Sequence, residues 1–424
     1  MNIKITGGHL TGKVQMISSK SDGHRLLIAA ALADAPTQIQ IQGVSEDIEA
    51  TILCLKNLGA KFERKGDIVF VTPAPPYQEN ISVLDCRESG STLRFLLPVA
   101  AALGRSVLVE GAGRLPKRPI GILTDLLSNH GCYISSSQLP LEMSGQLTAG
   151  TFILPGNVSS QFITGLLFAL PLLEGDSEIV LTTPLESKGY VDMTLHTLQR
   201  FGIQVQETES GFAISGKQKY HSPGTIITEG DWSNAAFWLA AGAASGNGVT
   251  CCGLQQDSPQ GDKAIIPLLQ QFGAKIEMSE ECVTVQHATL KGCRIDVSQI
   301  PDLMPILCIV ASMAKGKTEI YNAARLRIKE SDRLSAMADC LHQLGIRAEE
   351  SQDGITIYGR ENTEQIPKEI QIDACNDHRI VMSAAVGAIV LGLEVTILGA
   401  EAVAKSYPAF FAEFIRLGGG ADVL

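Results

Sequence analysis

The sequence predicts an α/β fold built from six copies of one unit. Three observations carry this prediction. An amphipathic helix that ends in a glycine recurs six times, a more apolar helix precedes each copy, and a β-rich segment lies between the two. A self-similar period of this kind is the signature of a repeat architecture. The alternation of helices and strands within the unit indicates layered α/β packing.

The repeat is easiest to follow at the glycine that ends each amphipathic helix. A residue without a Cβ is favoured at this position, because the chain there takes a left-handed conformation that terminates the helix. The spacings are 72, 71, 71, 72 and 73 residues for Gly59, Gly131, Gly202, Gly273, Gly345 and Gly418. Chance does not keep such a period over six copies.

The other elements of the unit recur in the same order. The apolar helices are expected at residues 21–33, 89–103, 159–173, 231–245, 301–314 and 376–390. The β-rich segments that follow them are expected at 37–43, 106–111, 177–183, 248–253, 318–323 and 393–399. Two alternating strands then follow each amphipathic helix, which gives a βαβαββ-type unit once the strand ahead of each apolar helix is included. We expect the apolar helix to be buried and the amphipathic helix to be half-exposed.

The two ends of the chain fit together. The sixth copy stops at Leu424 where its strands should begin, and residues 2–16 form a strand pair that no repeat claims. We therefore expect the N-terminal strands to complete the last unit, with chain crossings near residues 18 and 229.

These crossings predict two domains of three repeats each. Residues 1–18 and 230–424 form one domain, with repeats 4–6, and residues 19–229 form the other, with repeats 1–3. A cleft between two pseudo-symmetric halves is a favourable place for a ligand, so the active site is expected in the interdomain cleft.

Composition excludes several classes of function. The net charge of −11 argues against nucleic-acid binding, which needs a basic surface. No stretch resembles a signal peptide or a membrane span, so we expect a cytoplasmic protein that does not associate with membranes. A monomer is the default expectation.

The ten cysteines predict neither a disulfide framework nor a metal site. Without a secretion signal a disulfide framework is not expected, and most of these residues stand in apolar stretches typical of small core side chains. There is no C-x-x-C motif and no clustered His/Cys spacing. We expect no metal and no cofactor.

Polar residues gather where helices begin. Arg25, Arg94, Arg333 and Arg379 lie in or near the first turn of their helices, where a cation is unfavourable by roughly 0.3–1 kcal/mol. Taken singly, each stretch is also explained by a helix cap, a turn or a local ion pair. Their recurrence at one position of the repeat favours binding of anions by helix N-termini and guanidinium groups.

The chemistry that these residues suit is transfer between anionic substrates. No phosphate-binding loop, dinucleotide motif, zinc-protease motif or nucleophile elbow is present. The same helix starts and nearby loops instead supply lysines and carboxylates, namely Lys20, Lys329, Lys405, Asp302 and Glu330. This set suits two phosphorylated or carboxylated substrates with proton transfer between them.

The chain resembles the enolpyruvyl transferase family, and within it the branch that acts on shikimate-3-phosphate. The resemblance runs through eleven stretches in order: "SKSDGHR" (19–25), "ESGSTLR" (88–94), "RPIG" (118–121), "VSSQF" (158–162), "ESKGYVDMT" (186–194), "EGDWSNAAF" (229–237), "QGD" (260–262), "IPD" (300–302), "RIKESDR" (327–333), "NDHR" (376–379) and "KSYPAF" (405–410). It implies two inside-out α/β barrel domains with three repeats each.

The resemblance also implies the substrates and their contacts. Shikimate-3-phosphate is expected on Lys20, Ser21, Arg25, Ser159, Ser160, Gln161, Ser187, Asp302 and Lys329. Phosphoenolpyruvate is expected on Lys20, Gly90, Arg118, Gln161, Arg333, Arg379 and Lys405. Gly90 suits such a site because a residue without a Cβ lets a ligand approach the backbone. Arg94 and His378 are secondary candidates.

The implied reaction is addition followed by elimination, on the shikimate pathway to chorismate and aromatic amino acids. Glu330 is expected to protonate the methylene carbon of phosphoenolpyruvate, while Asp302 or Lys20 takes the proton of the 5-hydroxyl. The tetrahedral intermediate then loses phosphate. Domain closure is expected to exclude water from the substrates.

Two alternatives and one departure remain. The first alternative is the sister enzyme that acts on UDP-N-acetylglucosamine, which lacks the S-K-S and K-E-[ST]-D-R signatures present here. The second is a non-catalytic repeat scaffold, which predicts polar residues scattered over all repeats, whereas here they gather at helix starts. The commoner form of the first family motif, G-S-K-S-x-S-N-R, is replaced here at Ser18, Gly23 and His24. No family contact is assigned between Asn322 and Arg327.

Overall fold

Six four-stranded sheets of one design carry the fold over the residues that the structure, a computed structural model, describes: 1–74, 81–244, 248–359 and 369–424. In each sheet the first two strands are parallel and the other two pairs are antiparallel. The chain divides into two compact units, and we call Met1–Ser19 with Glu229–Leu424 unit 1 and Lys20–Thr228 unit 2. The sequence-based crossings at 18 and 229 lie one residue from these boundaries.

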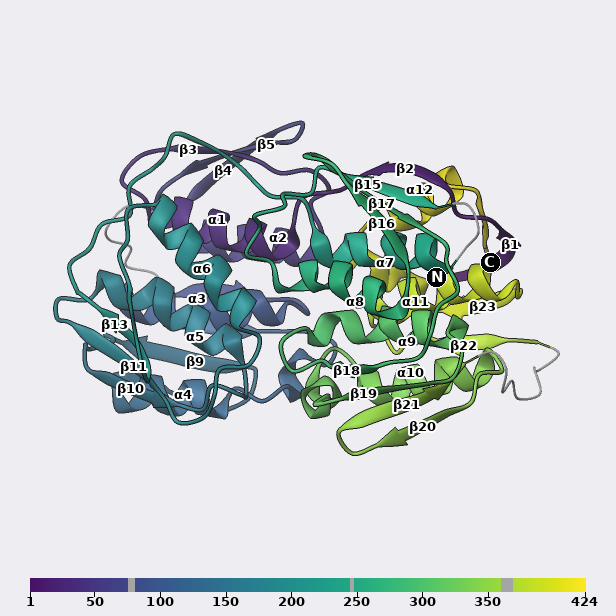
Figure 1. Cartoon of the computed structure of the whole chain (residues 1–424). Helices are drawn as coiled ribbons and strands as arrows, with labels where there is room; N and C mark the ends of the chain where they lie inside the picture. The colour runs from purple at the N-terminus through teal and green to yellow at the C-terminus, as the bar shows by residue number, and fades with distance from the viewer. Residues whose placement is uncertain (75–80, 245–247, 360–368) are drawn as a thin grey trace. The chain divides into compact units, whose positions relative to one another are not determined.

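Unit 2 holds three of the sheets (Figure 1). In hydrogen-bonded order they are β14 (Thr225–Ile227), β3 (Thr37–Gln40), β5 (Ile68–Thr72) and β4 (Lys61–Lys65); β6 (Ser82–Asp85), β7 (Val107–Glu110), β9 (Leu141–Gly145) and β8 (Cys132–Ile134); and β10 (Thr151–Leu154), β11 (Ser177–Leu181), β13 (Gly211–Ile214) and β12 (Gln206–Thr208).

Unit 1 holds the other three. They are β2 (Gly12–Gln15), β15 (Val249–Cys252), β17 (Cys282–Gln286) and β16 (Lys275–Met278); β18 (Arg294–Asp296), β19 (Lys317–Tyr321), β21 (Gly354–Tyr358) and β20 (Ala348–Ser351); and β22 (Gln371–Asp373), β23 (Val395–Leu398), β1 (Asn2–Gly8) and β24 (Gly419–Val423).

The prediction for the N-terminal strands is correct for β1 and wrong for β2. Residues 2–16 were predicted to act as a strand pair that completes the last unit, and β1 does complete the last sheet, between β23 and β24. Strand β2 instead pairs in parallel with β15 in the fourth sheet. In the same way β14, at the end of unit 2, supplies the first strand of the first sheet by pairing with β3. Each unit is therefore closed by a strand that is distant in sequence.

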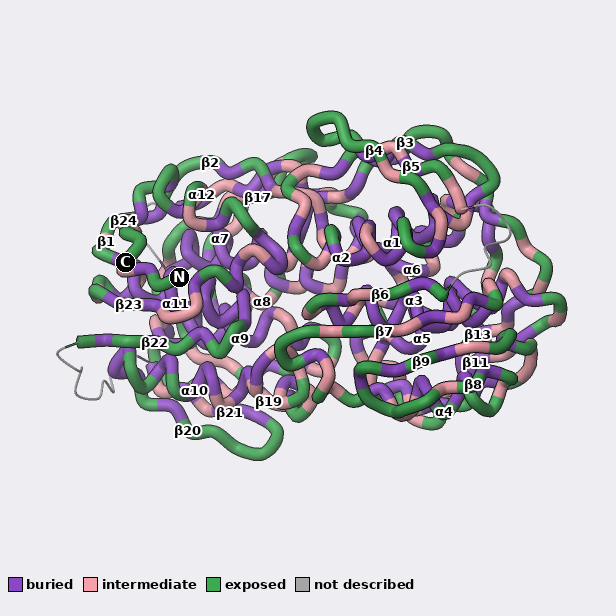
Figure 2. The backbone as a smooth tube through the Cα atoms, turned by 180° about the vertical axis from the view of Figure 1, so that it is seen from behind, coloured by how far each residue is buried: buried purple, intermediate pink, exposed green. Residues whose placement is uncertain are grey.

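Each unit encloses apolar helices, as predicted. They are α1 (Lys20–Leu32), α3 (Gly90–Ala102) and α5 (Ser160–Ala169) in unit 2, and α7 (Trp232–Ala244), α9 (Met304–Met313) and α11 (His378–Leu391) in unit 1. In unit 1 the three contact one another, and in unit 2 α3 packs on α5. Figure 2 shows the buried colour along these helices, in two hydrophobic cores, one in each unit. The expected fourth helix reached Ser245, which lies outside the described residues.

The amphipathic helices and short 3₁₀ turns complete the repeats. The helices are α2 (Glu46–Asn57), α4 (Gly121–Asn129), α6 (Lys188–Arg200), α8 (Ile265–Phe272), α10 (Arg333–Gln343) and α12 (Phe410–Arg416). The 3₁₀ turns are η1 (Leu115–Lys117), η2 (Leu170–Leu172), η3 (Gly261–Ala264), η4 (Pro301–Leu303), η5 (Ala324–Ile328) and η7 (Ala400–Lys405). All six repeat glycines have positive φ, between +72° at Gly345 and +106° at Gly59, which confirms their predicted role.

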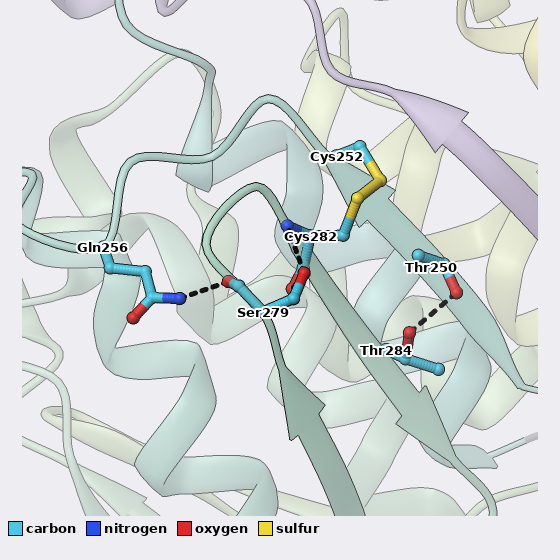
Figure 3. The surroundings of a disulfide bond; sticks show 6 residues. All are labelled: Thr250, Cys252, Gln256, Ser279, Cys282 and Thr284. Carbon is cyan, nitrogen blue, oxygen red and sulfur yellow. Dashed lines mark hydrogen bonds between the residues drawn. A yellow bond between two sulfur atoms is a disulfide. The ribbon is translucent and has the colours of Figure 1, made fainter.

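One disulfide contradicts the expectation that the cysteines are thiols of the core. Cys252 and Cys282 lie directly opposite each other on β15 and β17 and are bonded (Figure 3). The hydroxyl oxygens of Thr250 and Thr284, each two residues from a cysteine on the same strands, are 2.8 Å apart. Strand register brings the two cysteines together across 30 residues of sequence, so no local spacing pattern predicts the bond. In the parts of the chain described, no helix is both long and apolar enough to cross a membrane.

Candidate active site

In unit 1, the starts of η4, α10 and α11 and the segment after η5 bring charged side chains into one network. We call it the Asp302 cluster, and it comprises Asp302, Lys329, Glu330, Arg333, Asp377 and Arg379. Asp302 lies on η4, Lys329 and Glu330 follow η5, and Arg333 begins α10. Asp377 caps the start of α11, and Arg379 lies in its first turn. The structure thus brings together five residues that sequence reasoning assigned to the site.

Asp302 is the centre of this network. Its Oδ1 lies 2.8 Å from Nη1 of Arg333, and its Oδ2 lies 2.9 Å from Nη2 of Arg379. The Nζ of Lys329 lies 3.8 Å from the same Oδ1, which is ion-pair distance but too long for a hydrogen bond. One carboxylate is therefore surrounded by three cations.

Arg333 joins three carboxylates. Besides Asp302, its Nη2 lies 2.8 Å from Oε2 of Glu330 and its Nε lies 2.7 Å from Oδ2 of Asp377. The side chain is 1% exposed. A guanidinium buried to this degree needs such partners, because an unpaired charge in the interior is very costly. This pairing explains why an arginine can stand at the start of a helix without a bound anion.

Asp377 is a member of the cluster that sequence reasoning missed. Its Oδ1 accepts from the backbone N–H of Arg379, so it caps α11, and its Oδ2 accepts from the hydroxyl of Ser331 at 3.0 Å. The sequence signal, an acid directly before a helix, predicts only the cap. The contact with Arg333 depends on the packing of α10 beside α11 and is invisible in the sequence.

Lys405 and His378 lie beside the cluster. The Nζ of Lys405 donates to the backbone oxygen of Asn376 at 2.7 Å, so it reaches the turn that leads into α11. Asn376 has φ +55°, a left-handed conformation that costs energy in a residue with a side chain. His378 is buried, with its Nδ1 3.9 Å from Oδ1 of Asp377.

Burial and mutual charge shift the acid–base properties of the cluster. Burial disfavours the ionised form of Asp302, but Arg379, Lys329 and Arg333 outweigh it and hold the pKa of this carboxyl well below its usual value. Burial lowers the pKa of Lys329 to about 8, although Asp302 opposes the shift. At neutral pH the cluster therefore contains an ionised Asp302 beside a lysine that is close to its titration point.

In unit 2, the predicted residues lie at the starts of α1, α3, α5 and α6, except Arg118, which directly follows η1. Lys20, the first residue of α1, forms an ion pair of 2.8 Å with Oδ2 of Asp47 on α2. Both side chains are largely buried, at 16% and 13% exposure. Asp47 was not foreseen, because a carboxylate in the first turn of a helix is already explained by the helix dipole.

Arg25 is more firmly held than the sequence suggested. Its Nε donates to the hydroxyl of Thr194 at 2.9 Å, and its Nη atoms donate to the backbone oxygens of Ser21 and Tyr190 at 2.6 and 2.7 Å. Its guanidinium also lies over the ring of Phe95. Burial lowers its pKa to about 10. These contacts account for a buried arginine at the start of α1, and its role in holding a substrate phosphate stays a prediction.

Two arginines converge on Gly90 at the start of α3. A Cβ built on Gly90 meets Nη1 of Arg94 at 2.6 Å and Nη1 of Arg118 at 2.7 Å. Arg94 also donates to Oε1 of Gln161 at 2.8 Å, and the Nε2 of Gln161 donates to the hydroxyl of Ser91 at 2.9 Å. We call Gly90, Arg94, Arg118 and Gln161 the Gly90 cradle. Gly90 makes room for these two guanidinium groups, and its role in admitting a ligand stays a prediction.

The predicted serines begin the two following helices. Ser159 and Ser160 begin α5 directly before Gln161, and the side chain of Ser159 makes no capping hydrogen bond. Ser187 precedes α6, the helix that supplies Tyr190 and Thr194 to Arg25. It is buried with φ +56°, a left-handed conformation that a serine rarely adopts. Strain of this kind is often found at functional sites.

Two of the three departures from the family motif, Gly23 and His24, are buried in α1. A Cβ on Gly23 would lie 2.9 Å from Cδ1 of Ile41 and 3.2 Å from Cδ1 of Ile48, so a larger residue there requires these side chains to shift. His24 is buried, with its Nδ1 2.7 Å from the hydroxyl of Thr51. Burial, with Lys20 and Arg25 nearby, lowers the pKa of His24 well below its usual value, so this ring is neutral at pH 7.

Known proteins resemble the chain along almost its whole length. The family model described as EPSP synthase (3-phosphoshikimate 1-carboxyvinyltransferase) matches residues 5–414. A 3-phosphoshikimate 1-carboxyvinyltransferase of Clostridium kluyveri is 44% identical over 99% of this chain and 98% of its own length. The protein of that name from Clostridium acetobutylicum is 42% identical over 98% and 97%.

Solved structures agree with the sequence matches. EPSP synthase from Acinetobacter baumannii matches with a TM-score of 0.82 and 26% identity, with both chains covered completely. The predicted fold, the two-domain inside-out α/β fold of this family, is thereby confirmed. These matches together show that the chain belongs to the EPSP synthase (3-phosphoshikimate 1-carboxyvinyltransferase) family.

Proposed function

We propose that the chain transfers the enolpyruvyl group of phosphoenolpyruvate to the 5-hydroxyl of shikimate-3-phosphate and releases phosphate, on the pathway to chorismate and aromatic amino acids. The family match and the names of the relatives support these substrates. The observation that carries the chemistry is the contact of one carboxylate, Asp302, with three cations beside a second acid, Glu330.

In the addition step, the carboxyl group of Glu330 gives a proton to the methylene carbon of phosphoenolpyruvate. The 5-hydroxyl oxygen bonds to the neighbouring carbon, and its proton goes to Asp302, with Lys20 as the alternative acceptor. In the elimination step the methyl group returns a proton to the now ionised carboxylate of Glu330, the double bond re-forms, and the C–O bond to phosphate breaks. Each positioned acid or base contributes typically about 10²–10⁴-fold to the rate.

The low pKa of Asp302 constrains how it acts as a base. A carboxylate this strongly stabilised by cations takes up a proton reluctantly. An anionic substrate that pairs with Arg333 or Arg379 adds negative charge beside Asp302 and weakens the hold of both arginines on it. The pKa of Asp302 then rises toward the range useful for proton transfer. Substrate binding and activation of the base are thus the same event.

The binding roles follow from charge and position. We assign phosphoenolpyruvate to Arg333, Arg379 and Lys405 in unit 1, and to Lys20, Gly90, Arg118 and Gln161 in unit 2. Shikimate-3-phosphate is assigned to Lys20, Ser21, Arg25, Ser159, Ser160, Gln161 and Ser187, together with Asp302 and Lys329. Convergence of Arg94 and Arg118 on Gly90 supports an anion there, because guanidinium groups gathered at a helix start suit the binding of a phosphate or carboxylate.

The test is release of phosphate from phosphoenolpyruvate by the full chain with a chelator present. We expect release with shikimate-3-phosphate as acceptor and none with UDP-N-acetylglucosamine, the substrate of the alternative enzyme. Release only with the second acceptor, or none with either, contradicts the proposal, and the latter result favours the non-catalytic scaffold. That the enzyme is a cytoplasmic monomer stays a prediction from the sequence.

A further inference from the structure

We propose that His24 is a positioning residue, which holds the starts of α1 and α3 in a fixed relation through a line of buried hydrogen bonds. These two helix starts carry Lys20 and Gly90, which are both assigned to phosphoenolpyruvate. His24 has no part in the proposed reaction steps. The inference rests on the proposed function, because it concerns where that substrate binds.

The hydrogen bonds cross three helices of unit 2. His24 lies on α1, Thr51 on α2 and Thr92 on α3. The Nδ1 of His24 lies 2.7 Å from Oγ1 of Thr51, and this hydroxyl oxygen lies 2.6 Å from Oγ1 of Thr92. Thr92 in turn donates to Oγ of Ser89 at 2.7 Å. We call these four residues the His24 chain, and each of them is at most 1% exposed.

One end of the His24 chain is the cap of α3. The Oγ of Ser89 also accepts from the backbone N–H of Thr92 at 3.2 Å, and Gly90 follows Ser89 as the first residue of the helix. A helix start binds an anion through its free backbone N–H groups, so the position of the cap decides where these groups lie. A shift of Ser89 therefore moves Gly90 as well.

The other end lies one helical turn beyond Lys20. Lys20 forms its 2.8 Å ion pair with Asp47, which lies one turn before Thr51 on α2. Residues that are four apart lie on the same side of a helix. The ion pair and the hydrogen bond from His24 to Thr51 are thus two successive contacts between α1 and α2. The second contact fixes the spacing of the helices at which Lys20 reaches Asp47.

The His24 chain has one arrangement of hydrogens. A hydroxyl group has a single hydrogen, and Thr92 gives its own to Ser89. Thr51 therefore donates to Thr92, and a protonated Nδ1 of His24 donates to Thr51. Burial holds the pKa of His24 well below its usual value, so Nε2 carries no hydrogen at pH 7. Within the described residues Nε2 is buried without a hydrogen-bond partner, and a hydrogen there would be a buried donor with no acceptor.

The first test breaks the His24 chain at its middle. Thr51→Val removes the hydroxyl group at constant size, and we expect it to raise the KM for phosphoenolpyruvate about threefold to tenfold. The KM for shikimate-3-phosphate should change less, because α6 holds Arg25 independently of this chain. Thr51→Ser restores the hydroxyl group and should restore the KM. An unchanged KM for phosphoenolpyruvate in Thr51→Val overturns the proposal.

The matched control is Thr197→Val on α6. Thr197 is buried, and its hydroxyl donates to the backbone oxygen of Met193 at 3.0 Å, outside the His24 chain. Its loss should lower the stability of unit 2 without a change in KM. A KM for phosphoenolpyruvate that rises as much in Thr197→Val as in Thr51→Val reports a general loss of packing and contradicts the proposal.

The second test changes the donor. Asparagine carries its amide nitrogen on Cγ, as histidine carries Nδ1, so His24→Asn can keep the bond to Thr51, whereas His24→Leu cannot. We expect a KM for phosphoenolpyruvate close to that of the wild type in the first variant and a threefold to tenfold rise in the second. When His24→Leu is combined with Thr92→Val, the two increases should give less than their product, because both changes break one chain. Equal KM values for the two His24 variants, or increases that multiply, overturn the proposal.

Nuclear magnetic resonance gives a readout that does not depend on activity. In protein with ¹⁵N-labelled histidine, the ring signals that disappear in His24→Asn belong to His24. We expect the shifts of a neutral ring protonated on Nδ1 at pH 7, and a change of these shifts in Thr51→Val. A ring protonated on Nε2 contradicts the inference. A wild-type enzyme that has the expected signals but releases no phosphate contradicts the proposed function instead.

Discussion

Asp302 and Arg379 form a two-point contact: Nη2 of the arginine lies 2.9 Å from the Oδ2 of Asp302, and Nη1 lies 3.2 Å from its backbone oxygen. The second bond fixes the main chain of η4 relative to α11, so the carboxylate cannot rotate freely away from the guanidinium. A base that must be ready at one place needs such a support.

Asp377→Asn should destabilise the protein. Asp377 is fully buried against Arg333, whose side chain is 1% exposed, so loss of the charge leaves a buried guanidinium with fewer counter-charges. Removal of one partner of a buried pair costs about 3–5 kcal/mol. The free energy of unfolding from urea titration checks this value, with Asp339→Asn, an exposed change on α10, as the control. Equal free energies of unfolding for the two variants would show that Glu330 and Asp302 alone compensate the buried charge of Arg333.

Gly90→Ala should weaken binding of phosphoenolpyruvate. The added methyl group meets Nη1 of Arg94 and Nη1 of Arg118 at less than 3 Å, so at least one guanidinium must shift. A displacement of about 1 Å can cost up to about 10²-fold in activity. Gly121→Ala is the matched control, since a Cβ there meets nothing within 4 Å. The KM for phosphoenolpyruvate should rise in the first variant only, and a similar KM in both would remove the Gly90 cradle from the site.

The rate should fall above pH 8. Burial lowers the pKa of Lys329 to about 8, so in the free enzyme this side chain loses its charge as the pH rises through that value. The pH profile of kcat/KM reports groups of the free enzyme. Lys329→Arg keeps the charge at every accessible pH and should abolish this alkaline limb, whatever its effect on the maximal rate. Lys275→Arg, an exposed change, should leave the limb in place; a limb that persists in Lys329→Arg belongs to another group.

Asp302→Asn should lower kcat by about 10²–10⁴-fold with a smaller change in KM. The amide keeps the size of the side chain but cannot take up the hydroxyl proton. Rapid-quench measurement of kcat, with Asp339→Asn as control, checks this expectation. An unchanged kcat would leave Lys20 as the proton acceptor.

The periodic parts of the fold could be predicted from the sequence. The glycines with positive φ and the buried apolar helices follow from local pattern, because chain conformation and hydrophobic period act over a few residues. The pairing of β2 with β15 and the Cys252–Cys282 bond could not be, since both depend on strand register across long separations.

The site residues also divide into those that the local sequence predicts and those that depend on tertiary packing. Asp302, Glu330 and Arg333 stand out as polar residues at helix starts, and the structure joins them. Asp377 was missed, because an acid beside a helix start looks like a cap until its tertiary partner Arg333 is seen. For Arg25 the sequence raised the correct question, but the contacts found are with Tyr190 and Thr194.

The central claim is that Glu330 protonates the methylene carbon while the hydroxyl adds to its neighbour. The most direct measurement is deuterium incorporation into the methylene group of the product when the reaction runs in D₂O. Wild-type enzyme should place deuterium there, because the transient methyl group returns either a proton or a deuteron. Glu330→Gln should form little product and little deuterated phosphoenolpyruvate. Wild-type product without deuterium, or Glu330→Gln product labelled at the wild-type rate, would contradict the claim.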